Sequence, residues 1–157
     1  MSASPPVVVT LRPATAEDCR QVWRWRNDEQ TRRASFDSAP IPLEAHERWF
    51  LDSLQSPNRK IYIVVAGDQP SGVARLDVNG GQATVSIHLA PECRGRGVGP
   101  RALEALGEVA FGPLGLARLV AEIKVDNAAS LRAFIKAGFA PSRSGPVLHL
   151  VKARRES

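Results

Sequence analysis

The sequence predicts a single α/β domain built on a mixed, mainly antiparallel sheet, and three observations support this prediction. Short runs rich in β-branched residues alternate with segments whose apolar residues recur at helical spacing. Asn79-Gly80, between two strand-like runs, is typical of a type I′ turn, which joins antiparallel strands. A glycine-rich turn at residues 94–99 stands between a strand-like run and a helical pattern. The 157 residues suffice for one hydrophobic core.

The N-terminal part of the chain predicts one strand followed by two helices. β-branched residues indicate a strand at 7–11. A helix is expected over 15–26, because its first four residues, Thr-Ala-Glu-Asp, resemble a capping box. Residues 27–42 are polar, basic and interrupted by prolines, which indicates a loop or a short irregular helix. A second helix is predicted at 43–54, where apolar residues gather on one face.

Strands and helices alternate in the remainder. Three consecutive strands are predicted at 61–66, 72–78 and 82–89. Apolar periodicity then indicates a helix from residue 101 to the Gly112-Pro113 break, and Asp126-Asn127 can cap a further helix that ends at Gly138. The last two strands are expected at 119–125 and 147–151. The sheet should therefore be flanked by about four helices.

Composition narrows the class of protein. Apolar residues make up 43% and charged residues 24%, as in an ordinary globular domain. We expect one domain over residues 1–157, with flexible ends at 1–5 and 153–157. No apolar run approaches the ~20 residues that span a bilayer, and the N-terminus does not resemble a secretory signal, so we expect a cytoplasmic protein without a membrane partner. Cys19 and Cys93 lack metal-site spacing, so no metal is expected.

The net charge of +5 favours anionic ligands, and the glycine-rich turn predicts where one binds. Three glycines in five residues let successive N–H groups point inward at a helix start, while Arg94 and Arg96 add positive charge. The turn lacks the Lys-Ser/Thr ending of the loop that binds nucleoside triphosphates, so a triphosphate site is not expected. It also follows antiparallel hairpin strands and does not lie in a parallel βαβ unit, which argues against a dinucleotide-binding fold. No basic-aromatic motif is present, so we expect no nucleic-acid partner.

Two linked motifs resemble those of the GNAT superfamily of acetyl-CoA-dependent N-acetyltransferases. Residues 89–99, Leu-Ala-Pro-Glu-Cys-Arg-Gly-Arg-Gly-Val-Gly, fit the family's Arg/Gln-x-x-Gly-x-Gly/Ala signature and the Pro-Glu that often precedes it. Residues 127–139 are similar to its Asn-x-x-Ser-x-x-x-Tyr/Phe-x-x-x-Gly-Phe segment. The resemblance implies a GNAT-like single domain whose central strands splay apart, with acetyl-CoA as cosubstrate.

The resemblance also implies where the coenzyme binds. Its diphosphate would sit on the backbone N–H groups of residues 94–99, and its pantetheine arm between the strands at 82–89 and 119–125. Pro100 lacks an N–H and leaves one donor fewer at the helix start. The residues that the resemblance places at the coenzyme are Leu89, Ala90, Arg94, Gly95, Arg96, Gly97, Val98, Gly99, Asn127, Ser130 and Phe134.

Direct acetyl transfer needs a proton acceptor for the amine and a proton donor for the leaving thiolate. His88 is the first candidate base because of its intrinsic pKa, with Glu122 and Glu92 as alternatives. The strand register decides whether His88 faces the substrate. In many GNAT enzymes, a tyrosine that acts as the general acid occupies the position of Phe134. Phenylalanine cannot donate a proton, so Ser130 or water would protonate the thiolate. An alkyl thiol has a pKa of about 8.5, so this step needs little help.

Two short patterns indicate the acceptor. Trp-Arg-Asn at 25–27 and His-x-x-Trp-Phe at 46–50 resemble the branch with ribosomal-protein N-terminal and aminosugar N-acetyltransferases, and favour the aminosugar enzymes. We expect a small-molecule primary amine, with an aminosugar nucleotide as one candidate, and a monomer or homodimer. Protein N-terminal acetylation and a non-catalytic acyl-CoA sensor are the alternatives. The residues expected to flank the acceptor are Arg26, Asn27, Arg33 and Phe36.

Overall fold

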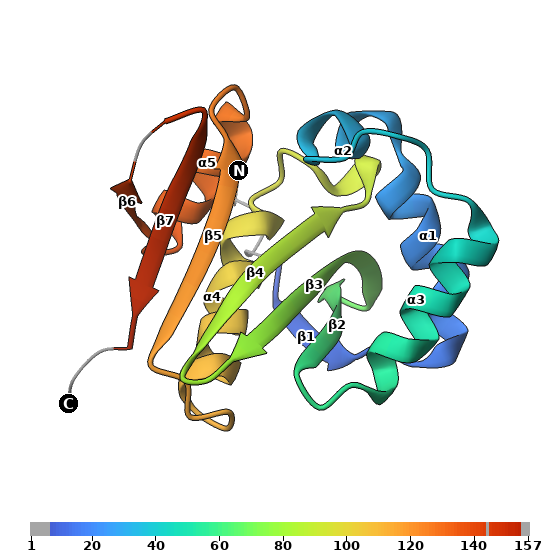
Figure 1. Ribbon diagram of the computed structural model, residues 1–157, viewed down its shortest axis with the longest axis horizontal. Coiled ribbons are helices and arrows are strands. Elements are labelled where there is room, and N and C mark those ends of the chain that lie inside the picture. The colour runs from blue at the N-terminus through green and yellow to red at the C-terminus, as the bar shows by residue number, and fades with distance from the viewer. Residues whose placement is uncertain (1–6, 144, 155–157) are drawn as a thin grey trace, which may run out of the picture.

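A seven-stranded sheet runs through the computed structural model, which describes residues 7–143 and 145–154 (Figure 1). The strand order is β1-β2-β3-β4-β5-β7-β6. All neighbouring strands pair antiparallel except β4 and β5, so the prediction of a mixed, mainly antiparallel sheet is confirmed. The strands are β1 (Val9–Pro13), β2 (Arg59–Ala66), β3 (Gln69–Asn79), β4 (Gln82–Leu89), β5 (Arg118–Lys124), β6 (Ala140–Arg143) and β7 (Val147–Ala153).

Helices cover both faces of this sheet. They are α1 (Cys19–Asn27), α2 (Glu29–Ala34), α3 (Leu43–Gln55), α4 (Val98–Phe111) and α5 (Ala128–Lys136), with 3₁₀-helices at Ala16–Asp18 and Pro91–Cys93. In Figure 1, α4 lies behind the centre of the sheet, whereas α1 and α3 lie beside the β1–β4 half. The predicted helices are therefore present, and α2 resolves the segment at 27–42 that the sequence left open between a loop and a short helix.

Two hydrophobic cores result from the alternation of side chains along the strands. On one face, Leu103 and Leu106 of α4 pack with Leu119 of β5, and all three are fully buried. On the other face, Phe50 of α3 packs with Ile63 of β2. Burying these apolar side chains fixes each helix against the sheet, and it also fixes which strand residues face α1 and α3.

The central strands splay apart, as the family resemblance implied. β4 and β5 pair only between residues 82–84 and 118–120, although both strands continue further. Figure 1 shows the two strands diverging beyond this short parallel contact. Their final residues therefore leave backbone groups unpaired across the gap, beside the start of α4.

Two details of the sequence-based fold were wrong. The hairpin closes on an Asn79–Gln82 pair, so Gly80 and Gly81 form the turn, and only Gly80 has a positive φ. A type I′ turn needs positive φ at both central residues, so the predicted turn at Asn79-Gly80 does not form. The strand β6 was not predicted, because it has four residues and contains Pro141, which is tolerated at the edge of a sheet.

The ends predicted to be flexible lie mostly outside the described residues, which exclude 1–5 and 155–157. Ala153 ends β7, and the N–H of Arg154 donates to the Ala117 carbonyl at 2.9 Å. Within the described part of the chain, no helix combines the length and apolarity needed to cross a membrane. No three His, Cys, Asp or Glu side chains gather there closely enough to hold a metal ion.

Candidate active site

The glycine-rich turn forms a cradle of backbone N–H groups at the start of α4. Gly95 and Gly97 have φ of 73° and 77°, in the left-handed region that glycine adopts without strain. Within residues 7–143 and 145–154, the N–H groups of residues 95–97 donate to no other residue. The first N–H groups of α4 lack intrahelical acceptors, so the missing N–H of Pro100, its third residue, costs no helical bond. The arrangement suits an anion such as phosphate.

A groove of about 540 Å³ extends from this turn along the end of β4 to α5. Besides the turn, its walls come from α2, the end of β4 and α5. The residues that were predicted to contact a coenzyme and that line the groove are Leu89, Arg94, Gly95, Gly97, Val98, Gly99, Asn127, Ser130 and Phe134. The structure thus brings the two sequence motifs together around one groove.

Two residues of the predicted coenzyme set lie elsewhere. Ala90 is fully buried, and its N–H donates to the Ser71 carbonyl at 2.8 Å, so this N–H is already engaged. Arg96 is exposed and does not line the groove. The cradle is therefore made of main-chain groups with little contribution from the Arg96 side chain.

The side chain of Arg94 anchors the turn to α2. One guanidinium nitrogen donates to Asp28 Oδ2 and to Thr31 Oγ1, both at 2.7 Å, and the other donates to Gln30 Oε1 at 3.0 Å. The guanidinium lowers the pKa of the Asp28 carboxyl below its usual range. No local sequence pattern predicts this pairing, because Asp28 and Arg94 lie 66 residues apart.

The start of α5 closes the groove opposite the turn. Asn127 caps this helix, and its Oδ1 accepts the N–H of Ser130 at 3.2 Å. Phe134 is buried, with its ring edge-on to Phe139 at 4.9 Å between centroids, and belongs both to the core and to the groove wall. Tyr62, the single tyrosine of the chain, packs against the α4-side core and does not line the groove.

A second cavity, of about 340 Å³, adjoins the groove on the α1 and α3 side of the sheet. All three predicted catalytic residues, His88, Glu122 and Ser130, line it. His88 and Ser130 also line the groove. The strand register places His88 and Glu122 on the same face of the sheet, because Thr84 pairs with Val120 and side chains alternate along each strand. Glu92, the third candidate base, is exposed and lines neither space.

The environment of His88 keeps its imidazole neutral. Burial lowers the pKa of His88 to about 4, and the nearby charges of Arg26, Arg75 and Arg94 act in the same direction. The ring is consequently unprotonated at neutral pH and is able to accept a proton. The low pKa also makes His88 a weak base. To accept the proton, the imidazole must therefore lie within hydrogen-bond reach of the amine, directly or through one water molecule.

The residues predicted to flank the acceptor divide into two pairs. Arg26 and the exposed Phe36 line the second cavity, whereas Asn27 and Arg33 do not. Asn27 has a supporting position, since its Oδ1 accepts the N–H of Ile41 at 2.9 Å. Arg33 is exposed and pairs with Glu29 on the same helix.

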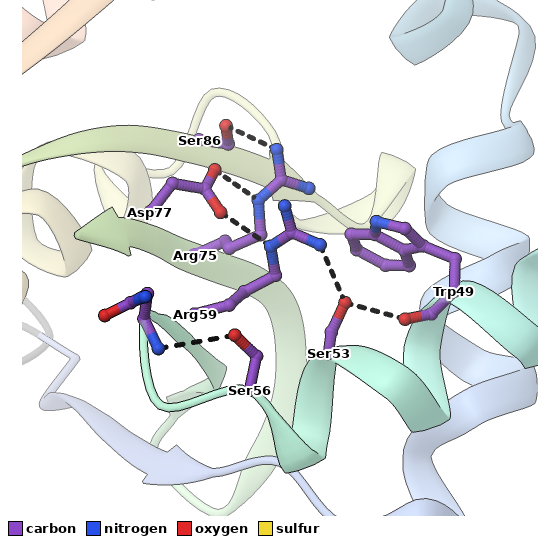
Figure 2. A network of polar contacts seen from close by, with 8 residues as sticks. Trp49, Ser53, Ser56, Arg59, Arg75, Asp77 and Ser86 are labelled. Carbon is purple, nitrogen blue, oxygen red and sulfur yellow. Dashed lines mark hydrogen bonds and ion pairs between the residues drawn. The ribbon is translucent and has the colours of Figure 1, made fainter. Parts of the chain in front are cut away.

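A cluster of three arginines surrounds Trp49, and two of them, Arg26 and Arg75, line this cavity; Figure 2 shows part of the cluster. The guanidinium carbons of Arg26, Arg75 and Arg59 lie 4.1, 5.2 and 5.6 Å from the centre of the Trp49 ring. Asp77 accepts from Arg59 at 2.7 Å and from Arg75 at 2.9 Å. Arg59, Arg75 and Asp77 were not identified from the sequence, because α1, α3, β2 and β3 bring the cluster together only in the folded chain.

His46 holds Arg26 in this cluster. Its Nε2 lies 2.9 Å from the Cys19 carbonyl and must carry the proton, so Nδ1 is left to accept from Arg26 at 2.9 Å. Burial lowers the pKa of His46, which keeps the ring in this neutral form. Phe50 stacks on the ring at 5.5 Å. The two short acceptor patterns of the sequence therefore meet in space.

Comparisons with known proteins agree with this architecture. A family model described as an acetyltransferase (GNAT) domain matches residues 9–140. An N-acetyltransferase of Streptomyces griseus is 30% identical over 144 residues, which cover 83% of this chain and 73% of the relative. A Bacillus subtilis (strain 168) protein named "Putative phosphinothricin acetyltransferase YwnH" is 33% identical over 142 residues, or 84% of each chain.

Solved structures share the fold. AAC(6')-Ib in complex with paromomycin and acetyl-CoA superposes with a TM-score of 0.83, at 22% identity and 93% coverage of each chain. Spermidine N-acetyltransferase from Vibrio cholerae, in complex with CoA and spermine, gives a TM-score of 0.84 at 18% identity, covering 92% of this chain and 95% of that one. The family model spans most of the sequence, and the resemblance seen in its two motifs is confirmed. The chain belongs to the GNAT family and is an acetyltransferase.

Proposed function

We propose that this protein transfers an acetyl group from acetyl-CoA to the primary amine of a small molecule by direct attack on the thioester. The observation that carries the proposal is that the groove at the glycine-rich turn and the second cavity meet at shared walls. The shared residues are Ala34, Ile87, His88, Asn127, Ser130 and Phe134. Two ligands that enter from opposite sides would have their reactive ends together at this junction.

The groove suits the coenzyme in its chemistry. Its main-chain cradle offers N–H donors at a helix start that have no partner among the residues the structure describes, which suits a diphosphate. Beyond the cradle, Leu89 and Phe134 provide apolar wall for a pantetheine arm between β4 and β5. The complexes of AAC(6')-Ib and of the spermidine enzyme, which contain acetyl-CoA and CoA, support this assignment.

The residues at the junction suit the two proton transfers. The amine nitrogen would form a bond to the thioester carbonyl carbon as the carbon–sulfur bond breaks, releasing a thiolate. His88, neutral at physiological pH, would accept the proton from the amine directly or through water, with Glu122 as the alternative acceptor. Ser130 or water would supply a proton to the thiolate, because Phe134 has none to give.

An amine panel tests the proposal. The protein would be incubated with acetyl-CoA and aminosugars, amino acids, polyamines or peptides, and both released thiol and acetylated product would be measured, with an amine-free reaction as control. We expect stoichiometric thiol and acetylated product for at least one small amine. Acetylation of peptides alone would support protein N-terminal acetylation instead. Tight coenzyme binding with no turnover on any amine would contradict the proposal and favour an acyl-CoA sensor.

A further inference from the structure

The inner wall of the second cavity carries more positive than negative charge. Arg26 and Arg75 line this cavity, and Arg59 lies beside them on the Trp49 ring. Within the described part of the chain, Asp77 is the carboxylate that pairs with this cluster, and both of its oxygens are used, by Arg59 and Arg75. Three guanidiniums therefore face one carboxylate.

Arg26 is the least compensated of the three. It donates to the neutral His46 ring and stacks on Trp49, and no carboxylate among residues 7–143 and 145–154 forms an ion pair with it. Burial lowers the pKa of Arg26 to about 10, and the charges of Arg75 and Arg59 act in the same direction. The surroundings thus disfavour the positive charge, but the guanidinium is still protonated at neutral pH. A partly buried cation in this position is stabilised by an anion that arrives from outside the chain.

Donors remain available for such an anion. Arg75 uses Nε for Asp77 and Nη2 for Ser86, and Arg26 uses Nη1 for His46. Within the described residues, Nη1 of Arg75 and Nη2 of Arg26 have no protein acceptor. Arg26, Arg75, Ser86 and His88 also line a small inner pocket together, so these donors lie on the same side as the candidate base. Guanidinium pairs of this kind match the oxygens of carboxylate or phosphate.

Glu122 gives the wall opposite Arg26 and Arg75 a negative charge. It lies on β5 and lines the cavity from the far side of the strand gap, whereas the other two charged lining residues, Asp37 and Arg32, are opposite in sign to each other. An acceptor with an ammonium group and an anionic group would place the ammonium toward Glu122 and His88 and the anion toward the arginines. A volume of about 340 Å³ is near the lower end of the about 300–1,000 Å³ typical of small-ligand pockets, which favours a compact acceptor.

We propose, on the basis of the acetyl transfer proposed above, that the acceptor is a small primary amine that also carries an oxyanion, either a carboxylate or a phosphorus oxyanion, and that Arg26 and Arg75 bind this oxyanion. The amine then lies at the junction with the groove. Polyamines and other polycations are poor acceptors, because Arg26, Arg32 and Arg75 outnumber Asp37 and Glu122 among the described residues that line the cavity.

Matched acceptor pairs test the proposal. Each pair keeps the amine and changes the charge: glucosamine 6-phosphate against glucosamine, 2-aminoethylphosphonate against ethanolamine, and methionine against methioninamide, with spermidine as the cationic probe. In at least one pair, we expect the kcat/KM of the anionic member to exceed that of its neutral partner by at least about tenfold. A factor of this size corresponds to one hydrogen bond to a charged group. The first two pairs report on phosphorus oxyanions and the third on carboxylate. Equal rates within every pair, or faster acetylation of spermidine, would overturn the proposal.

Two arginine variants separate specific binding from general electrostatics. Arg26→Gln should remove most of the preference within the best pair, with the larger change in KM for the anionic member. Arg24→Gln, an exposed change two residues earlier on the same helix, should leave the preference intact. Because the preference is a ratio within one protein sample, it does not depend on the fraction that folds. Loss of the preference in Arg24→Gln, or its persistence in Arg26→Gln, would contradict the assignment.

A binding experiment distinguishes this proposal from the proposed function. If no amine is acetylated, the proposed function fails, and ³¹P NMR of 2-aminoethylphosphonate still tests the arginine site. We expect line broadening with the wild-type protein and with Arg24→Gln, and none with Arg26→Gln. Binding of the phosphonate without turnover would retain the anion site and reject the acetyl transfer. No broadening with the wild-type protein at any coenzyme concentration would reject the anion site for phosphorus oxyanions. No broadening of the methionine signals in a ¹H NMR experiment of the same design would reject it for carboxylates.

Discussion

His46 Nδ1 accepts a hydrogen bond from the guanidinium of Arg26 at 2.9 Å, and this contact joins α3 to α1 beside the second cavity, which Arg26 lines. The other ring nitrogen donates to the Cys19 carbonyl, so one neutral ring satisfies two partners. Arg26 is thereby held against Trp49 at the cavity wall. The position of the proposed anion-binding arginine thus depends on a histidine that does not itself line the cavity.

This contact predicts an energetic coupling between the two residues. His46→Phe keeps the stacking on Phe50 but leaves the Cys19 carbonyl and Arg26 without their partner, and should lower the free energy of unfolding by about 1–3 kcal/mol. In a double-mutant cycle with Arg26→Gln, measured by urea unfolding, the coupling should exceed about 0.5 kcal/mol. The same cycle with Arg24→Gln should be additive. Additivity in both cycles would mean that the contact contributes nothing.

The shifted pKa of His88 predicts how stability depends on pH. Its pKa is about 4 in the folded protein against 6.5 for an ordinary histidine, so between these values the unfolded chain binds a proton that the folded protein does not. The free energy of unfolding should therefore fall as the pH is lowered from 6.5 to 4. At about 1.4 kcal/mol per pKa unit, His88 accounts for at most about 3.4 kcal/mol of this fall.

His88→Gln isolates that contribution. The variant should lose less stability than the wild type between pH 7 and pH 4.5, measured by urea unfolding at each pH. His46 and the paired carboxylates titrate in both proteins, so the difference between the two slopes reports on His88. Identical slopes would show that His88 titrates normally and is exposed to water in the folded protein.

Much of the fold could be predicted from the sequence, because local patterns determine it. The apolar spacing of α4 and the Asn127 cap of α5 are encoded within a few residues, and both helices form where predicted. The four-residue strand β6 was missed, because Pro141 is a local signal against a strand and only pairing with β7 stabilises it. The hairpin turn was displaced by one residue, since Gly80 and Gly81 offer two ways to turn.

The parts of the site that are formed by one contiguous motif could be predicted from the sequence. The parts that depend on packing between distant elements could not. The left-handed glycines of the cradle follow from a contiguous motif. The orientation of His88 needed the strand register, and the Arg26–His46–Trp49 arrangement needed the packing of α1 on α3. Arg94 was predicted as a phosphate donor from its charge, whereas its side chain pairs with Asp28. Contacts over 20 or 66 residues leave no local pattern to read.

The pairing of Asp28 with Arg94 predicts a coupling between α2 and the glycine-rich turn. Asp28 accepts from Arg94 and also caps α2 through the N–H of Thr31 at 3.1 Å. Asp28→Ala should lower the free energy of unfolding by about 1–2 kcal/mol through the lost cap, and should raise the KM for acetyl-CoA because the turn is no longer anchored. Glu29→Ala, which removes an exposed pair with Arg33 on the same helix, should change stability by less than about 0.5 kcal/mol. Equal effects of the two variants would count against the anchoring role.

The left-handed glycines allow a matched test of the cradle. Gly97 and Gly67 have φ of 77° and 64°, and a Cβ on either would meet no heavy atom within 4 Å, so Gly→Ala imposes similar backbone strain at both. Each should cost about 1 kcal/mol of stability. Only Gly97→Ala adds a methyl group to the lining of the groove, and it should raise the KM for acetyl-CoA at least about tenfold, whereas Gly67→Ala should leave this KM unchanged. An equal change in both would attribute the effect to strain.

A crystal structure of the protein with coenzyme A tests the central claim most directly. The claim predicts that the diphosphate oxygens lie about 2.7–3.2 Å from main-chain nitrogens of residues 95–99, with the thiol at the junction beside His88. A larger groove of about 1110 Å³, lined by Gly107, Gly138 and Lys152, lies on the α4 and α5 side of the molecule. Coenzyme bound in that groove, with the glycine-rich turn empty, would contradict the account.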